Sequence, residues 1–163
     1  SDETASDLLN FTLYGGSFES YGCSGQDPTY FITGKAGKIT IDFLEPQTNP
    51  SFRVWGLNDD DSVRVFVNGE PYSLNKSTAA YDKKVICKTV TKEPGEEGVK
   101  FISGILVGAI NNEIGNYSYQ NITLLTSKVN SITLLGFSGR GWGFIGVTIG
   151  NGNAGQASPK SGR

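Results

Sequence analysis

The sequence predicts an all-β domain, a two-sheet antiparallel β-sandwich with jelly-roll or Greek-key topology and about ten strands. Three observations lead to this fold class. Apolar and polar residues alternate with period two in several segments, turn residues separate these segments at intervals of about eight to twelve residues, and no segment keeps a helical period. Short strands at such regular spacing are typical of sandwiches and barrels.

The two clearest strands lie in the first half of the chain. In the segment 39–43 every second residue is a large apolar one and the residues between are polar, which indicates a half-buried strand. In the segment 62–67 three valines share one face and Arg64 and Phe66 the other, and the segment leads into Asn68 and Gly69, a pair that accepts the positive φ angles of a type I′ turn. We therefore expect a β-hairpin over residues 63–74.

Eight further segments have the composition of strands and are bounded by glycine, asparagine, proline or charged turns. They span residues 8–14, 30–33, 52–57, 84–91, 99–107, 118–125, 129–137 and 142–149. The apolar segment 99–110 contains two glycines, so we expect a strand pair or a bent strand there. We also expect the first and the last of these strands to pair with each other.

The aromatic content of the chain is sufficient for the core of one domain, with nine Phe, seven Tyr and two Trp in 163 residues. We predict a flexible N-terminal segment over 1–7, a single sandwich over 8–150, and a flexible C-terminal linker or tail over 151–163. The last of these segments is rich in glycine and has no aliphatic residue larger than alanine. Such ends are expected of a module that belongs to a larger chain.

The composition argues against several classes of function. The chain has no histidine, which excludes Ser-His-Asp and Cys-His catalysis and imidazole zinc sites. Its formal net charge is −2 and its Lys and Arg are scattered, so we expect no nucleic-acid partner. The most apolar segment, 99–110, is too short to cross a bilayer, so we expect no membrane insertion.

The glycine-rich segment 136–144 is the strongest indication of a ligand site. Trp142 and Arg140 lie among four glycines, which leave the backbone and the flat indole open to a ligand. Sugars stack their C–H faces on such rings, and Arg or Asn side chains donate hydrogen bonds to hydroxyls. The other candidate ligand-binding residues are Trp55, Asn58, Tyr117 and Tyr119, of which the two tyrosines are expected on one sheet face. The alternative places Trp142 and Phe144 in the core, with glycines that only turn the chain.

Three consecutive aspartates in the segment 56–62 raise the question of a calcium site. Carboxylate and backbone oxygens are the ligands that calcium prefers, and Asp59 and Asp61 are the candidate ligands. Consecutive residues of an extended chain point in opposite directions, and the residue spacing of an EF-hand is absent. A solvated acidic turn is therefore the alternative, and no other cofactor is predicted.

The two cysteines, Cys23 and Cys87, match no metal-ligand spacing, and we predict that they form a disulfide. Cys23 lies in a glycine-flanked, irregular segment, where a free thiol would be open to oxidation in a secreted protein. Such a bridge requires an oxidising compartment. Two buried thiols are the alternative, because cysteine is often buried whether or not it is bonded.

The segment 131–149, SITLLGFSGRGWGFIGVTI, resembles the closing strand pair of secreted bacterial β-sandwich modules that are jelly-roll, carbohydrate-binding-module-like or adhesin-like. Such modules often end in a strand, a glycine-rich turn and a second strand with a Gly-x-Gly-Phe motif. The asparagine or aspartate that often follows the Gly-Phe pair is absent here, since Ile145 takes that place. The resemblance implies a β-sandwich at an extracellular or cell-surface location, and it assigns no binding residue.

These observations favour a non-catalytic, lectin-like carbohydrate-recognition module of a secreted or cell-surface protein, with a glycan or cell-surface polysaccharide as its partner. The alternative is a structural or adhesive module of a surface or viral fibre assembly, which acts through protein–protein contacts. A glycosidase is the third hypothesis, because its chemistry needs only two carboxylates at a suitable separation. Candidates for such a pair are Glu19, Asp27, Asp42, Glu45 and Glu113.

Overall fold

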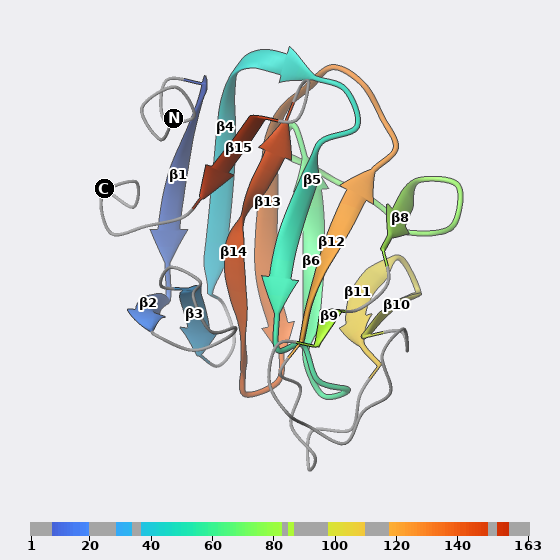
Figure 1. Cartoon of the computed structure of the whole chain (residues 1–163). Helices are drawn as coiled ribbons and strands as arrows, with labels where there is room; N and C mark the ends of the chain where they lie inside the picture. The colour runs from blue at the N-terminus through green and yellow to red at the C-terminus, as the bar shows by residue number, and fades with distance from the viewer. Residues whose placement is uncertain are drawn as a thin grey trace.

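The computed structural model describes residues 8–19, 29–33, 37–82, 85–86, 98–109, 118–149 and 153–156. All the elements within these residues are β-strands, and they form two antiparallel sheets (Figure 1). This confirms the expected all-β, two-sheet sandwich. A search of the same residues for a helix with the length and apolar character of a membrane span found none.

The strands are numbered in their order along the chain. They are β1 (Leu9–Tyr14), β2 (Gly16–Glu19), β3 (Thr29–Thr33), β4 (Lys38–Gln47), β5 (Ser51–Trp55), β6 (Ser62–Val67), β7 (Glu70–Pro71), β8 (Ala79–Tyr81), β9 (Val85–Ile86), β10 (Val99–Ile102), β11 (Ile105–Gly108), β12 (Ser118–Leu124), β13 (Val129–Ser138), β14 (Gly141–Ile149) and β15 (Asn153–Gln156). β15 lies inside the segment predicted to be a flexible tail, and it extends the sandwich because it pairs with β14.

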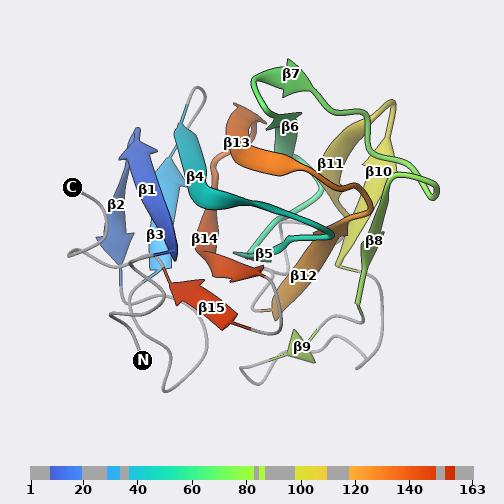
Figure 2. The same cartoon turned by 90° about the horizontal axis from the view of Figure 1, so that it is seen from above.

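The strand order is that of a jelly roll. The first sheet, sheet A, has the order β1-β4-β13-β6-β11-β10, with β7 beside β6. The second, sheet B, has the order β2-β3-β14-β5-β12-β8, with β15 beside β14 and β9 beside β12. Successive strands alternate between the sheets, as β4, β5 and β6 do and again β11, β12, β13 and β14. This alternation distinguishes a jelly roll from simple stacked hairpins, and Figure 2 shows the two layers from above.

Two predicted turns are present in the structure. The strand predicted over 62–67 is β6, and Asn68 and Gly69 have φ angles of 53° and 81° in the turn that leads to β7. The segment 99–110 contains a strand pair, because β10 and β11 are joined by Ser103 and Gly104, with φ angles of 52° and 80°. In both turns a pair of positive φ angles matches the twist of the flanking strands.

The expectation that the first and the last predicted strands pair with each other is wrong. β1 pairs with β4 in sheet A, whereas β14 lies in sheet B and pairs with β3, β5 and β15. The two strands meet across the core instead, where the rings of Phe11 and Phe144 make an edge-to-face contact with centroids 5.6 Å apart. Both strands are apolar because each contributes a face to the sandwich.

The core lies between the two sheets and follows the period-two pattern. In β4, Ile39, Ile41 and Phe43 point inward and are buried, and the residues between them face outward. Trp142 and Phe144 of β14 are both 0% exposed, so of the two alternatives for these residues the structure shows the core position. The ring of Trp142 therefore presents no open face to a ligand.

Replacing Trp142 with Ala should lower the free energy of unfolding by about 3–5 kcal/mol, because it leaves a large cavity at the centre of the core. Urea denaturation followed by circular dichroism measures this change. Tyr14→Ala is the control, since Tyr14 is 68% exposed. Its effect should be about 0.5 kcal/mol or less. Equal destabilisation by the two substitutions would contradict the buried position of Trp142.

Candidate functional site

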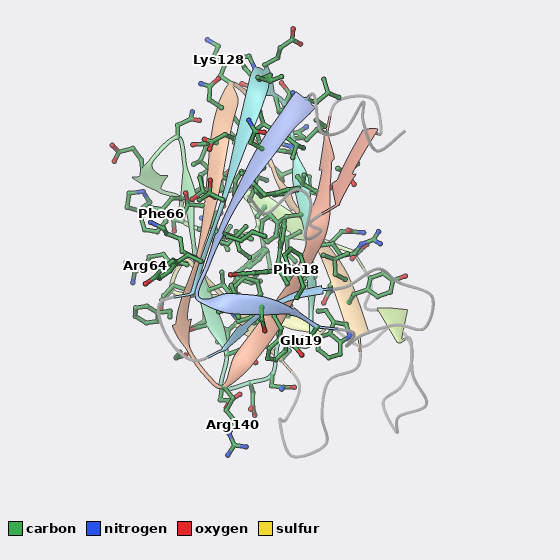
Figure 3. The ribbon with its side chains drawn as sticks, turned by 90° about the vertical axis from the view of Figure 1, so that its left-hand side faces the viewer. Phe18, Glu19, Arg64, Phe66, Lys128 and Arg140 are labelled. Atoms are coloured by element: carbon green, nitrogen blue, oxygen red, sulfur yellow. The ribbon has the colours of Figure 1, made fainter. Side chains whose placement is uncertain are left out.

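The described residues among those predicted to bind a ligand lie in four places. Trp142 is in the core, while Trp55 and Tyr119 are cross-strand neighbours in sheet B. Asn58 lies in the connection between β5 and β6, and Arg140 in the turn between β13 and β14. The Arg140 side chain is exposed and projects from the lower end of the molecule in Figure 3. Three predicted residues lie outside the described part of the chain, Tyr117, Cys23 and Cys87, and their roles stay predictions.

Aromatic side chains meet in one cross-strand row of sheet B. Gly143 of β14 lies opposite Phe31 of β3 on one side and opposite Trp55 of β5 on the other. Trp55 in turn lies opposite Tyr119 of β12. We call Phe31, Trp55 and Tyr119 the aromatic row. Neighbouring strands are about 4.8 Å apart, so the row spans about 14 Å.

The aromatic row faces away from the core. The residue next to Phe31 in β3 is Ile32 and the residue next to Trp55 in β5 is Val54, and both are buried at 0% and 1% exposure. Because successive side chains of a strand point to opposite faces, the row lies on the outer face of sheet B. The side chains of Phe31 and Tyr119 are half-buried on this face.

The glycine in the middle of the row explains how two of the rings meet. Gly143 has no Cβ, so nothing separates the side chains on its two neighbouring strands. The rings of Phe31 and Trp55 make an edge-to-face contact above it, with centroids 6.1 Å apart and an interplanar angle of 65°. Trp55 is only 7% exposed. Trp55 is therefore the most buried ring of the row, and the rings of Phe31 and Tyr119 are more exposed.

A polar network lies beside the aromatic row, two residues further along β12. Arg53 donates from Nε to Asn121 Oδ1 at 2.9 Å, and its guanidinium carbon lies 4.8 Å from the centroid of the Tyr119 ring. Asp82 Oδ1 accepts the Asn121 backbone N–H at 2.9 Å, and Oδ2 accepts its side-chain amide at 2.8 Å. We call Arg53, Asn121 and Asp82 the polar network. It holds a planar cation, an amide and a carboxylate in fixed positions next to an aromatic ring.

Sequence reasoning missed four residues of this surface: Phe31, Arg53, Asn121 and Asp82. For Phe31 a local signal exists, because the alternation of the strand predicted over 30–33 places it opposite to its apolar neighbours. Arg53 has the same signal, because it lies between Phe52 and Val54, but no local signal brings Arg53, Asn121 and Asp82 together. Their contacts depend on the register of β12 against β5 and on the chain that follows β8, which only the folded structure reveals.

The two predicted calcium ligands are not brought together. Asp59 is exposed, whereas Asp61 is 0% exposed. Asp61 Oδ2 accepts the backbone N–H of Asn58 at 2.8 Å, and Oδ1 accepts that of Gly141 at 3.2 Å. Across the described ranges, no three His, Cys, Asp or Glu side chains are grouped so that they could hold a metal ion. The structure thus favours a structural role for Asp61, which fastens the β5–β6 connection to the start of β14.

Burial raises the pKa of the Asp61 carboxyl from 3.8 to about 6. Loss of hydration is the largest effect, and it outweighs the backbone hydrogen bonds from Asn58, Gly141 and Arg140, which lower the pKa. Gly139 allows the carboxylate to approach the turn this closely. Its φ angle is 100°, and a Cβ at this position would collide with Asp61 Oδ1.

The raised pKa of Asp61 should make the fold more stable at low pH. Between about pH 4 and pH 6 the folded protein binds a proton at Asp61 that the unfolded chain does not bind. Unfolding experiments on the wild type and on Asp61→Asn across this range isolate the effect. We expect the stability of the wild type relative to the variant to fall as the pH rises, by at most about 3 kcal/mol. A relative stability that rises with pH would show that the fold holds the carboxylate ionised.

Comparison with known proteins assigns no function to this chain. No protein-family model and no curated protein matches the chain. Among solved structures, one match is the catalytic domain of a GH87 α-1,3-glucanase in complex with nigerose, with a TM-score of 0.46 and 11% sequence identity. The match covers 93% of this chain and 30% of that chain, so this chain spans less than a third of its length.

Proposed function

We propose that the protein is a non-catalytic, lectin-like carbohydrate-recognition module that binds a glycan on the outer face of sheet B. The observation that supports it most is the packing of the Arg53 guanidinium over the Tyr119 ring, within the polar network. A sugar ring presents an apolar C–H face and a rim of hydroxyls. A surface that binds it needs an aromatic ring and hydrogen-bonding groups side by side, and this surface has both.

The direction of the aromatic row predicts what kind of glycan binds. The row runs across the strands and spans about 14 Å, which is longer than one sugar ring. We therefore expect a chain of several sugars to bind more tightly than a monosaccharide. Arg53 and Asp82 carry opposite charges and both contact Asn121. The network as a whole is therefore suited to a neutral sugar.

A binding role also fits the carboxylate of the network. Both oxygens of Asp82 accept hydrogen bonds from Asn121, which holds them in place as acceptors. The carboxylates considered for hydrolysis that the structure describes lie elsewhere, Glu19 in β2 and Asp42 and Glu45 in β4. Asp27 and Glu113, the other two, lie outside the described residues. We propose that recognition at this surface proceeds without catalysis.

The Tyr119 ring provides the sharpest test of this surface. A glycan array identifies ligands, and titration calorimetry of the best ligand then compares the variants. Tyr119→Ala should weaken binding at least about tenfold, because the stacking surface is lost. Tyr119→Phe should retain most of the affinity, since it keeps the ring. Phe66→Ala is the matched control, because Phe66 is also half-buried but lies on the outer face of sheet A.

Two results would count against the glycan site. One is a wild-type protein that binds no glycan at millimolar concentration. The other is a loss of affinity in Phe66→Ala as large as that in Tyr119→Ala, which would point to a general effect on the fold. Circular dichroism of each variant shows whether its sheets remain formed.

We further propose a secreted or cell-surface location, which the disulfide predicted between Cys23 and Cys87 tests directly. Protein isolated without reductant, then unfolded and treated with an alkylating agent, should gain no alkyl group, because a bonded sulfur cannot react. The same sample reduced beforehand should gain two groups, one for each cysteine of the chain. Alkylation of both cysteines without prior reduction would contradict the disulfide and weaken the proposed location.

A further inference from the structure

A second cross-strand row lies on the outer face of sheet A and has a different chemical character. Lys38 of β4 lies opposite Tyr14 of β1 on one side and opposite Leu135 of β13 on the other. Leu135 in turn lies opposite Arg64 of β6. We call these four residues the cationic row. Their neighbours along each strand point into the core, so the row faces outward.

The side chains of this row are more open than those of the aromatic row. Tyr14 is 68% exposed, and Lys38 is exposed as well. At the other end of the row the guanidinium of Arg64 lies over the ring of Phe137, 4.9 Å from its centroid, and Phe137 is 48% exposed. Figure 3 shows Arg64 on the outer side of the sandwich, away from the side chains between the sheets.

Among the described residues of sheet A, the charges of the cationic row have little compensation nearby. Within the described residues, the Nε atom of Arg64 is buried and has no hydrogen-bond partner. Asp42 is the next carboxylate on the outer face of β4, four residues from Lys38, which corresponds to about 13 Å along a strand. The partners of Asp42 on the neighbouring strands are Asn10 and Ser131, which are uncharged. This contrasts with Arg53, which Asn121 links to a carboxylate.

We propose that the cationic row, together with Phe137, is a second binding site, which takes an acidic saccharide that carries carboxylate or sulfate groups. Lys38 and Arg64 would contact the anionic groups, and the rings of Tyr14 and Phe137 would contact the apolar faces of the sugars. Leu135 between the two cations gives the site a flat apolar floor. The inference does not depend on the glycan site of sheet B, because it concerns other residues on the opposite face.

The small number of cations on this face favours an acidic saccharide over a nucleic acid. Lys38 and Arg64 lie two strands apart, which corresponds to about 10 Å. A nucleic-acid strand carries one phosphate for about every 3.4 Å of helix axis, and its binding normally needs a continuous basic surface. Here the same face carries Asp42, and the whole chain has a net charge of −2. An acidic saccharide carries its anionic groups on sugar rings with apolar C–H faces, and it matches two cations beside exposed aromatic rings better than a nucleic acid does.

The test uses four probes on the whole chain: polygalacturonate for carboxylate, heparin for sulfate, dextran as the neutral polymer and a single-stranded oligonucleotide. Binding is measured by titration calorimetry at low and at high salt. The wild type should bind polygalacturonate or heparin, more weakly at high salt, and more tightly than the oligonucleotide. Binding of polygalacturonate would indicate recognition of carboxylate groups, and binding of heparin alone would indicate recognition of sulfate groups.

The variants decide whether the row itself is the site. The double variant Lys38→Gln, Arg64→Gln should bind the acidic polymer about tenfold more weakly or worse. The matched control is Lys76→Gln, Lys100→Gln, which removes the same charge from exposed positions outside the row. It should stay within about twofold of the wild type, because isolated surface charges contribute little. Thermal unfolding shows that both variants are folded.

Three outcomes would overturn the inference. They are a wild type that binds neither acidic polymer, a control variant that loses as much affinity as the double variant, and tighter binding of the oligonucleotide than of either acidic saccharide. Failure of the neutral glycan site would be a separate result, since the variants of the cationic row are scored on acidic polymers alone.

Discussion

The buried carboxylate of Asp61 is the contact on which one end of the sandwich depends. It accepts hydrogen bonds from Asn58, which follows β5, and from Gly141, which begins β14, two neighbouring strands of sheet B. The backbone carbonyl of Asp61 accepts the N–H of Gly108 of β11 at 3.3 Å, which adds a strand of sheet A. A carboxylate in this position is costly to leave unpaired, so these backbone groups hold one another in place.

This anchor also sets the register that creates the candidate glycan site. With Gly141 fixed at Asp61, Trp142 points into the core and Gly143 lies on the outer face between Phe31 and Trp55. A slip of β14 by one residue would turn every side chain to the opposite face, which would expose Trp142 and separate the aromatic row. The core and the surface site thus depend on the same register, and the volume of the buried indole makes that register unambiguous.

Features set by neighbouring residues could be predicted from the sequence, and features set by distant contacts could not. The alternation over 62–67 and the Asn68-Gly69 turn appear where expected, because both are local. Nothing in a run of three aspartates shows that Asp61 is the one that is buried, since its hydrogen-bond partner Gly141 and the closely packed Gly139 are far away in the chain. The burial of Trp142 and the partners of the first and last predicted strands likewise depend on where β14 lies in the fold. The sequence alone offers Trp55 and Tyr119 as candidate binding residues, yet their direct pairing follows only from the register of β12.

The two outer faces use the same local unit, an arginine over an aromatic ring, in two electrostatic settings. On sheet B the ring is Tyr119 and Asn121 links Arg53 to Asp82, so the unit is close to neutral. On sheet A the unit of Arg64 lies in a row with a lysine and without a carboxylate, so it keeps its positive charge. Ligand charge would then be selected by the residues around the pair and not by the pair itself. Because the core separates the two faces, a domain with both sites would join a neutral glycan to an acidic one.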